Sequence, residues 1–329
     1  MKEPTLFIGP MSKNIVDAII NYCDNSAEDL SIGMIPSRRQ VENTGGYVNN
    51  WTTEEFCNYV KSKTNKVLLV RDHGGAMQGY SEDDGLDSFV EDCKHFDIIH
   101  VDVWKAFPDY KDGLQATINL INLGIKENPN VLYEVGTEES IRPFTTEELD
   151  NLLTDLKREL SEEAFSKIKY AVIQSGTALE GNTNIGSFNQ DRLIDMCAVV
   201  KKHGLISKEH NGDYLDGTLL RIKFDNGLKS INVAPEFGQI ETKVLYQLMD
   251  DTTKERFYNI CYDSKRWVKW VSDDFVPEDN KEKIINICGH YVFSNPEFLK
   301  LKEELPLYVD SKIKLTIALR ISQMLTHST

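Results

Sequence analysis

Short apolar runs alternate with longer segments of helical periodicity along most of this 329-residue chain. This alternation is typical of a parallel sheet whose strands are joined by crossover helices. The runs that read as strands are Thr5–Gly9, Leu30–Ile35, Lys66–Arg71, Ile98–Val103, Asn130–Val135, Tyr170–Gln174, Gly204–Lys208 and Ser230–Ala234. The segments that read as helices between them are Lys13–Cys23, Thr53–Ser62, Leu86–His95, Gly113–Ile125, Thr145–Leu160, Gln190–His203 and Gln239–Met249. Eight strands joined in this way predict an α/β fold, the (β/α)8 TIM barrel.

Strand signals stop near Asp250, and only helical patterns follow. These patterns are Lys254–Cys261, Asn280–Cys288, Pro296–Glu304 and Ser311–Met324. We therefore expect a barrel domain over residues 1–250 and a C-terminal helical extension over residues 251–329 that packs on the barrel.

One segment within the barrel departs from the alternation. Tyr214–Asn226 contains a run of apolar and β-branched residues that leads into Asp225-Asn226-Gly227. An Asp-Asn-Gly sequence after such a run favours a strand and a tight turn over a crossover helix.

The charge distribution excludes several functional classes. The net charge is −15, and no basic run exceeds the pairs Arg38-Arg39 and Lys201-Lys202, so we expect no nucleic-acid partner. No stretch of 18 apolar residues and no secretory leader are present, so we expect no membrane partner.

The six cysteines show no C-x-x-C spacing, which predicts buried thiols in a cytoplasmic protein.

Polar residues gather where the predicted strands end, which is where a barrel carries its catalytic side chains. His73 and His210 follow two of these strands, with Asp72, Asp102 and Glu138 at or after others. Imidazoles and carboxylates on one barrel mouth predict a divalent-metal site, although a single histidine at a strand end is more often a hydrogen-bonded loop residue. Asp72 next to His73 could exchange protons with a substrate.

The other five histidines are weaker candidates for this site. His100 lies within a predicted strand, whereas His95, His203, His290 and His327 fall on predicted helices or at their ends.

Five motifs follow one another in a specific order. They are Gln40-Val41-x-x-x-Gly45-Gly46-Tyr47, Asp72-His73-x-Gly75, His100-x-Asp102, Gly136-Thr137-Glu138 and Glu209-His210-x-x-Asp213-Tyr214. In this order the chain resembles the accessory, so-called non-catalytic, subunit family of tagatose-bisphosphate aldolase. That family is related to class II, metal-dependent aldolases, and some of its members look like ketose C4 epimerases.

The resemblance implies roles for individual residues. Asp72 would be the catalytic proton carrier, and His73 and His210 would bind the metal. Glu138 would be a ligand or a second acid/base group, with Glu134 as its competitor, and Asp102 would support catalysis. The candidate substrate-binding residues are Gln40, Gly45, Gly46, Asn211, Asp213 and Asn232.

The implied cofactor is a divalent metal, zinc or alternatively manganese, and the implied substrate is a small carbohydrate, a ketose that carries a phosphate. Class II aldolases also use a third histidine from a later strand and a glycine-rich phosphate loop. The predicted eighth strand, Ile231 to Glu236, has no histidine. This departure leaves the third ligand and the phosphate site unassigned and favours an epimerase-like site over an ordinary aldolase.

Three functions follow from these observations. The first is a metal-dependent aldolase or C4 epimerase that works by retro-aldol chemistry. The second is a non-catalytic subunit that stabilises a separate aldolase subunit, and the third is a sugar-binding module without chemistry. A homo-oligomer and an aldolase partner subunit are both open as assemblies.

Overall fold

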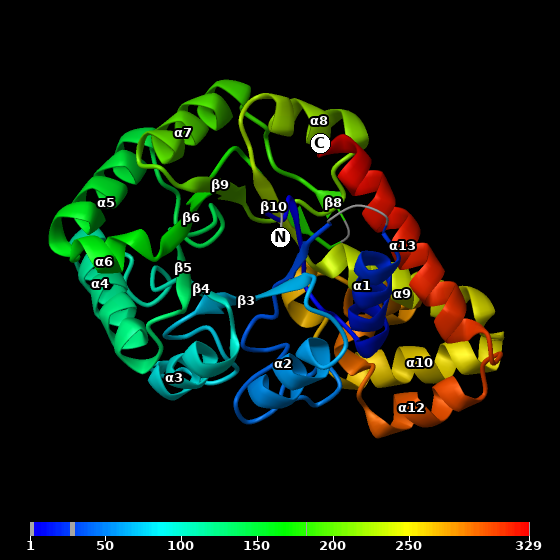
Figure 1. The fold of residues 1–329 in the computed structure, drawn as a ribbon. Helices are drawn as coiled ribbons and strands as arrows, with labels where there is room; N and C mark the ends of the chain where they lie inside the picture. The colour runs from blue at the N-terminus through cyan, green and yellow to red at the C-terminus, as the bar shows by residue number, and fades with distance from the viewer. Residues whose placement is uncertain (1–2, 27–29, 182, 329) are drawn as a thin grey trace.

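A computed structural model describes residues 3–26, 30–181 and 183–328 of the chain. Eight parallel strands form a closed barrel in the order β1-β10-β9-β6-β5-β4-β3-β2 (Figure 1). Their bounds are Leu6–Ile8 (β1), Ile32–Met34 (β2), Val67–Gly74 (β3), Ile98–Val101 (β4), Leu132–Val135 (β5), Ile168–Ile173 (β6), Ile206–Glu209 (β9) and Ser230–Val233 (β10). Each of them overlaps one of the eight predicted runs, so the predicted TIM barrel is confirmed.

Helices surround the barrel on its outer face, as Figure 1 shows. They are Lys13–Asn25 (α1), Thr53–Lys61 (α2), Leu86–His95 (α3), Tyr110–Glu127 (α4), Thr146–Glu159 (α5), Glu162–Ser166 (α6), Gln190–Lys202 (α7), Gly217–Asp225 (α8) and Pro235–Leu248 (α9). Side-chain capping explains why several of these helices begin where they do. Thr52 and Glu55, for example, form a reciprocal capping box at the start of α2. A short antiparallel pair that the sequence does not predict, Leu179–Glu180 (β7) with Thr183–Asn184 (β8), lies in the connection between β6 and α7.

The strand predicted after Tyr214 is wrong, because that segment forms α8. The Asp216 side chain accepts a hydrogen bond from Leu219 N at 2.8 Å and so caps the helix. The segment joins the parallel strands β9 and β10, and such a connection needs a crossover that a hairpin cannot provide. Gly227, with φ of 112°, follows the Asn226 cap as the left-handed residue that ends a helix, so the Asp-Asn-Gly sequence is a helix terminus.

The C-terminal part of the described chain is helical, as the periodicity indicates. Its helices are Asp251–Asp263 (α10), Lys281–Cys288 (α11), Pro296–Glu303 (α12) and Val309–His327 (α13), with 3₁₀ turns at Val268–Trp270 (η1), Pro277–Asp279 (η2) and Gly289–Val292 (η3). Helix α13 packs against α1, α8 and α9, so the chain end closes over the outer face of the barrel beside its first and last helices (Figure 1). The domain boundary at residue 250 remains a prediction.

Two further sequence expectations concern the cysteines and membrane-spanning helices. All six cysteines are free and buried, as predicted. None of the described helices is both long enough and apolar enough to cross a bilayer.

The regular alternation of side chains along the strands sorts residues into barrel interior and outer layer. On β9, Lys208 faces inward to the rings of Phe7 and Tyr170, at 3.8 and 5.4 Å from their centroids. Glu209 turns outward and pairs with Lys223 of α8 at 2.6 Å. The apolar floor inside the barrel consists of Phe7, Ile35, Val70, Ile98 and Tyr170.

Outside the barrel, Arg71 of β3 is fully buried and forms paired hydrogen bonds with Asp92 of α3, at 2.7 and 2.8 Å. Its guanidinium also donates to Pro36 O at 2.8 Å. Removing one member of a buried ion pair leaves the other charge without compensation, at a cost of about 3–5 kcal/mol.

We expect Arg71→Ala to lower the free energy of unfolding by about 3–5 kcal/mol, measured by urea denaturation followed by circular dichroism. Arg158→Ala is the matched control, because Arg158 is 62% exposed and its pairs with Asp155 and Glu159 lie at the surface. That control should unfold near the wild-type urea midpoint, because exposed ion pairs contribute little to stability. Equal stability of the two variants would contradict the structural role of the Arg71–Asp92 pair.

Candidate metal centre

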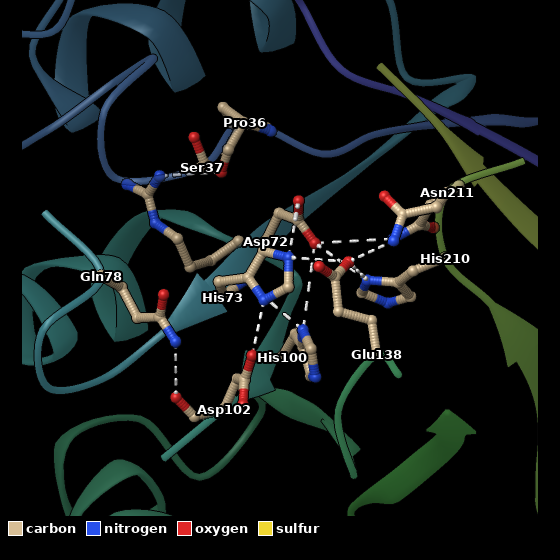
Figure 2. A network of polar contacts seen from close by, with 12 residues as sticks. Pro36, Ser37, Asp72, His73, Gln78, His100, Asp102, Glu138, His210 and Asn211 are labelled. Carbon is tan, nitrogen blue, oxygen red and sulfur yellow. Dashed lines mark hydrogen bonds and ion pairs between the residues drawn. The ribbon is translucent and has the colours of Figure 1, made fainter. Parts of the chain in front are cut away.

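The end of β3 places two consecutive side chains in the barrel mouth. In a regular strand Asp72 and His73 would face opposite sides of the sheet. Here His73 adopts the left-handed conformation, with φ of 48°, and the register between β3 and β4 shifts between Arg71 and Gly74. This irregularity allows both Asp72 and His73 to face the site, as Figure 2 shows.

Three histidines from three strand ends surround Asp72 (Figure 2). His73 Nε2 lies 3.6 Å from Asp72 Oδ2, while His100 Nδ1 and His210 Nδ1 lie 3.9 and 3.8 Å from Asp72 Oδ1. Each of the four residues offers a ligand atom within 4.8 Å of the others. The sequence predicts two of these histidines as ligands; the structure adds His100 of β4.

The other ring nitrogen of each histidine is held by a hydrogen-bond acceptor. His73 Nδ1 bonds Asp102 Oδ2 at 2.6 Å, and His210 Nε2 bonds Glu134 Oε1 at 2.8 Å. His100 Nε2 bonds the carbonyl oxygen of Gly136 at 3.0 Å. Because a carbonyl can only accept, His100 carries its proton on Nε2, and the two carboxylates favour the same arrangement in the others. In the neutral rings the lone pairs of the three remaining nitrogens therefore face Asp72.

One backbone contact uses the lone pair of His100 Nδ1 that a metal would need. The backbone N–H of His73 donates to His100 Nδ1 at 3.4 Å, a long hydrogen bond. The contact agrees with an unprotonated Nδ1, since only a lone pair can accept it.

Carboxylates outnumber cations around the three rings. Asp72, Asp102, Glu134 and Glu138 contact the histidines, and the ammonium group of Lys208 pairs only with Glu134, at 2.6 Å. Burial opposes a charged imidazole at His73, but Asp72, Asp102 and Glu138 together raise its pKa to about 10. Burial likewise opposes ionisation of Asp72, yet the neighbouring imidazoles hold its pKa below the usual range. The excess negative charge favours a bound cation at this point.

The two candidate glutamates have different positions. Both carboxylate oxygens of Glu134 are engaged, by Lys208 and by His210, on the interior side of the rings. Glu138 lies beside the lone-pair nitrogens, with Oε2 at 3.8 Å from His73 Nε2 and 3.9 Å from His210 Nδ1. It accepts hydrogen bonds from Asn211 Nδ2 at 2.9 Å and from the Ser140 hydroxyl. Glu138 is therefore the glutamate that faces the open side of the centre.

Two of the predicted substrate-binding residues also reach the centre. Asn211 contacts Glu138 as described, and Asn232 Nδ2 lies 3.5 Å from Asp72 Oδ1. The Asn232 Oδ1 atom is buried and accepts no hydrogen bond from the described part of the chain. A buried acceptor without a donor favours a ligand hydroxyl at this position.

The remaining predicted substrate contacts have structural partners. Asp213 Oδ1 accepts from the backbone N–H groups of Ala234 and Glu236, at 3.0 and 2.8 Å, at the start of α9. The Gln40 side chain binds Ser37 N and Met11 Sδ. A Cβ on Gly46 would meet Gln40 O at 2.1 Å, so this glycine permits close backbone packing, and Gly45 adopts φ of 98°. Substrate binding by these four residues remains a prediction.

His100 is the candidate metal ligand that sequence reasoning missed. Its position two residues before Asp102 contained the signal, because residues i and i+2 of a strand face the same side. A histidine on the same face as an inward carboxylate is a stronger candidate than one on a helix.

Comparison with known proteins establishes the fold. No protein-family model matches the chain, and no curated protein matches its sequence. A probable tagatose 6 phosphate kinase from Sinorhizobium meliloti 1021 has a TM-score of 0.75 and 17% identity, over 99% of this chain and 100% of its own. The fructuronate-tagaturonate epimerase from Cohnella laeviribosi has a TM-score of 0.66 and 10% identity, over 100% and 82%. The YdjI aldolase from Escherichia coli K12 has a TM-score of 0.53 and 11% identity, over 91% and 90%.

The chain thus shares its barrel with a probable kinase and an epimerase that are named for sugars and with an aldolase. At these identities the likeness concerns the fold alone. The resemblance to the aldolase accessory subunit family stays a prediction.

We expect His100→Ala to weaken metal binding by more than about 100-fold, since losing a residue that only orients a ligand already costs about 10- to 100-fold. Competition with a fluorescent zinc chelator measures the affinity without reference to activity. His95→Ala is the control, because His95 belongs to the surface group with Glu54 and Glu91 that could also attract a cation. Wild-type affinity in the His100 variant would exclude His100 as a ligand.

Proposed function

We propose that this protein is a metal-dependent enzyme that acts on a ketose by retro-aldol chemistry, as an aldolase or a C4 epimerase. One observation carries the proposal. Each of three imidazoles has one ring nitrogen held by a hydrogen-bond acceptor, and the other ring nitrogens point to a common position beside Asp72 and Glu138.

The residues present fit a divalent cation. His73, His100 and His210 would hold it, and imidazole nitrogens beside carboxylates suit zinc or manganese better than magnesium or calcium. When bound, such an ion would act as a Lewis acid on the carbonyl and the adjacent hydroxyl of the ketose. The side chains around the centre differ in solvent exposure. Asp72 and His73 keep 14% and 17% of their surface exposed, whereas His100 and His210 are buried. Substrate would approach from the Asp72 side.

Asp72 is the proposed proton acceptor. As the C3–C4 bond breaks, its electron pair remains on C3, the C4 hydroxyl becomes an aldehyde, and the hydroxyl proton passes to Asp72. The neighbouring imidazoles hold the pKa of Asp72 below its usual range, so its carboxylate is ionised at neutral pH and has a free site for the proton. Asp72 could instead bind the cation as a fourth ligand, and the Asp72 variant described below distinguishes these roles.

Glu138 and the two asparagines complete the proposed site. Glu138 is positioned by Asn211 and can serve as a second acid/base group, on the opposite side of the His73 ring from Asp102. The free Asn232 Oδ1 can accept a hydrogen bond from a sugar hydroxyl next to Asp72. Release of the aldehyde fragment gives an aldolase. Rotation of the fragment and re-addition to the same carbon gives the C4 epimer, with the proton returned to the new alkoxide.

We expect Asp72→Asn to lower turnover by roughly 10²–10⁴-fold while metal affinity stays near the wild-type value, because the amide cannot take the proton. NMR of product formation from a panel of ketose phosphates and ketouronates measures turnover, and chelator competition measures affinity. Asp112→Asn, on the exposed face of α4, should leave both unchanged. Loss of metal together with activity would make Asp72 a ligand instead.

Treatment with a chelator should abolish turnover, and added zinc or manganese should restore it, because the proposed chemistry needs a Lewis acid at the carbonyl. The same NMR assay on the metal-depleted and reconstituted protein provides the measurement. Undiminished turnover after metal depletion would refute the proposed function. A protein that binds metal at the three histidines but turns over no ketose would support the accessory-subunit alternative.

A further inference from the structure

Apart from the metal centre, a cavity of about 270 Å³ lies between the loops of the barrel mouth and the C-terminal extension. Its lining residues are Arg39, Tyr47, Tyr80, Lys265, Arg266, Val268, Lys269 and Tyr291. They come from the β2 loop, the β3 loop and the segment from the end of α10 to η3. Four of the eight are cations and none is acidic, which is unusual in a chain with a net charge of −15.

Aromatic rings lie beside three of these four cations. The Arg266 guanidinium lies 4.4 Å from the Tyr80 ring centroid, and the Lys265 ammonium lies 3.8 Å from that of Tyr262. Lys269 Nζ lies 4.5 Å from the Trp270 centroid and 5.6 Å from the Tyr291 centroid. A ring stabilises a cation without neutralising its charge.

Within the described ranges, none of the four cations forms an ion pair. Arg39 Nε donates to the carbonyl oxygen of Gly79 at 3.1 Å, and its terminal nitrogens form no hydrogen bond with the part of the chain that the structure describes. Lys105 adds a fifth positive charge nearby, where its ammonium donates to Met77 O at 2.8 Å. Lys269 keeps an exposed surface, yet partial burial and its neighbours Arg39, Arg266 and Lys105 lower its pKa to about 8. The cavity therefore gathers positive charges that form no ion pair with a carboxylate of the described residues.

The loop after β3 connects this cavity with the metal centre. Gly79 contacts Arg39, as described, and its neighbour Gln78 donates to the backbone oxygen of Asp102 at 3.1 Å. Asp102 in turn anchors His73 (Figure 2). A ligand that reaches both would lie along this loop.

We infer that this cavity binds the phosphate group of the substrate, an assignment to a sugar phosphate that rests on the proposed function. A phosphate monoester carries close to two negative charges at neutral pH and presents three acceptor oxygens. Two guanidinium groups and two ammonium groups supply the matching donors, and guanidinium groups bind phosphate in paired hydrogen bonds. A single carboxylate would leave most of these cations uncompensated, which favours phosphate over a uronate.

The test is ³¹P NMR of inorganic phosphate with the full chain as purified. Phosphate should bind the wild type, and Arg266→Gln combined with Lys269→Gln should weaken binding about tenfold or more. Lys312→Gln, at an exposed lysine of α13, is the matched control and should bind as the wild type does. Circular dichroism confirms that each variant is folded.

Two further arms separate this site from other sources of phosphate affinity. His73→Ala should keep phosphate binding, and loss of binding there would place phosphate at the metal centre and overturn the inference. Unchanged binding by the double variant, or equal displacement of phosphate by glucuronate, would overturn it as well. The assay involves no turnover, so phosphate binding in this cavity together with absent metal-dependent turnover would refute the proposed function alone.

Discussion

The candidate site depends on the fixation of one nitrogen in each of three histidines. An imidazole that is free to rotate or to change its protonated nitrogen offers a metal no defined lone pair. Here Asp102, Glu134 and the carbonyl of Gly136 each hold one ring nitrogen, and the opposite nitrogens meet beside Asp72. The closed barrel supplies this geometry, because adjacent parallel strands end at the same rim and so bring residues far apart in sequence together.

Charged side chains occupy successive levels from the barrel interior to its mouth. The interior ammonium of Lys208 lies over the ring of Phe7 and pairs with Glu134, which in turn holds His210. Above this layer the carboxylates of Asp72, Asp102 and Glu138 exceed the neighbouring cations, so the centre attracts a positive ion. The cavity beside the C-terminal extension has the opposite sign. Opposite potentials at the two places suit a substrate with a polar reacting end and an anionic far end.

The fold could be predicted from the sequence because eight apolar runs of strand length alternate with helical periodicity. The α8 segment could not, since Ile222 and Phe224 favour a strand locally and only the parallel arrangement of β9 and β10 requires a helix. Asp72, His73, Glu138 and His210 could be placed in one mouth from their positions after strands. Their roles could not be fixed, because these depend on which nitrogen each ring presents.

Sequence reasoning missed His100 and the basic cavity for different physical reasons. The spacing of His100 and Asp102 places both on one face of the fourth strand, but a buried histidine in an apolar strand usually has only a packing role. The register of β4 with its neighbour β5 adds that His100 pairs with the inward-facing Glu134. Arg39 and Arg266 are more than two hundred positions apart in the sequence, with Tyr80 between them, and the three residues show no shared motif. Only the packing of the C-terminal extension over the mouth brings them together.

The account rests on a cation held by three histidines, and anomalous diffraction from crystals grown with zinc tests this most directly. It predicts one strong peak at about 2.0–2.1 Å from His73 Nε2, His100 Nδ1 and His210 Nδ1. No peak at these nitrogens, or a peak only at the surface group of Glu54, Glu91 and His95, would contradict it.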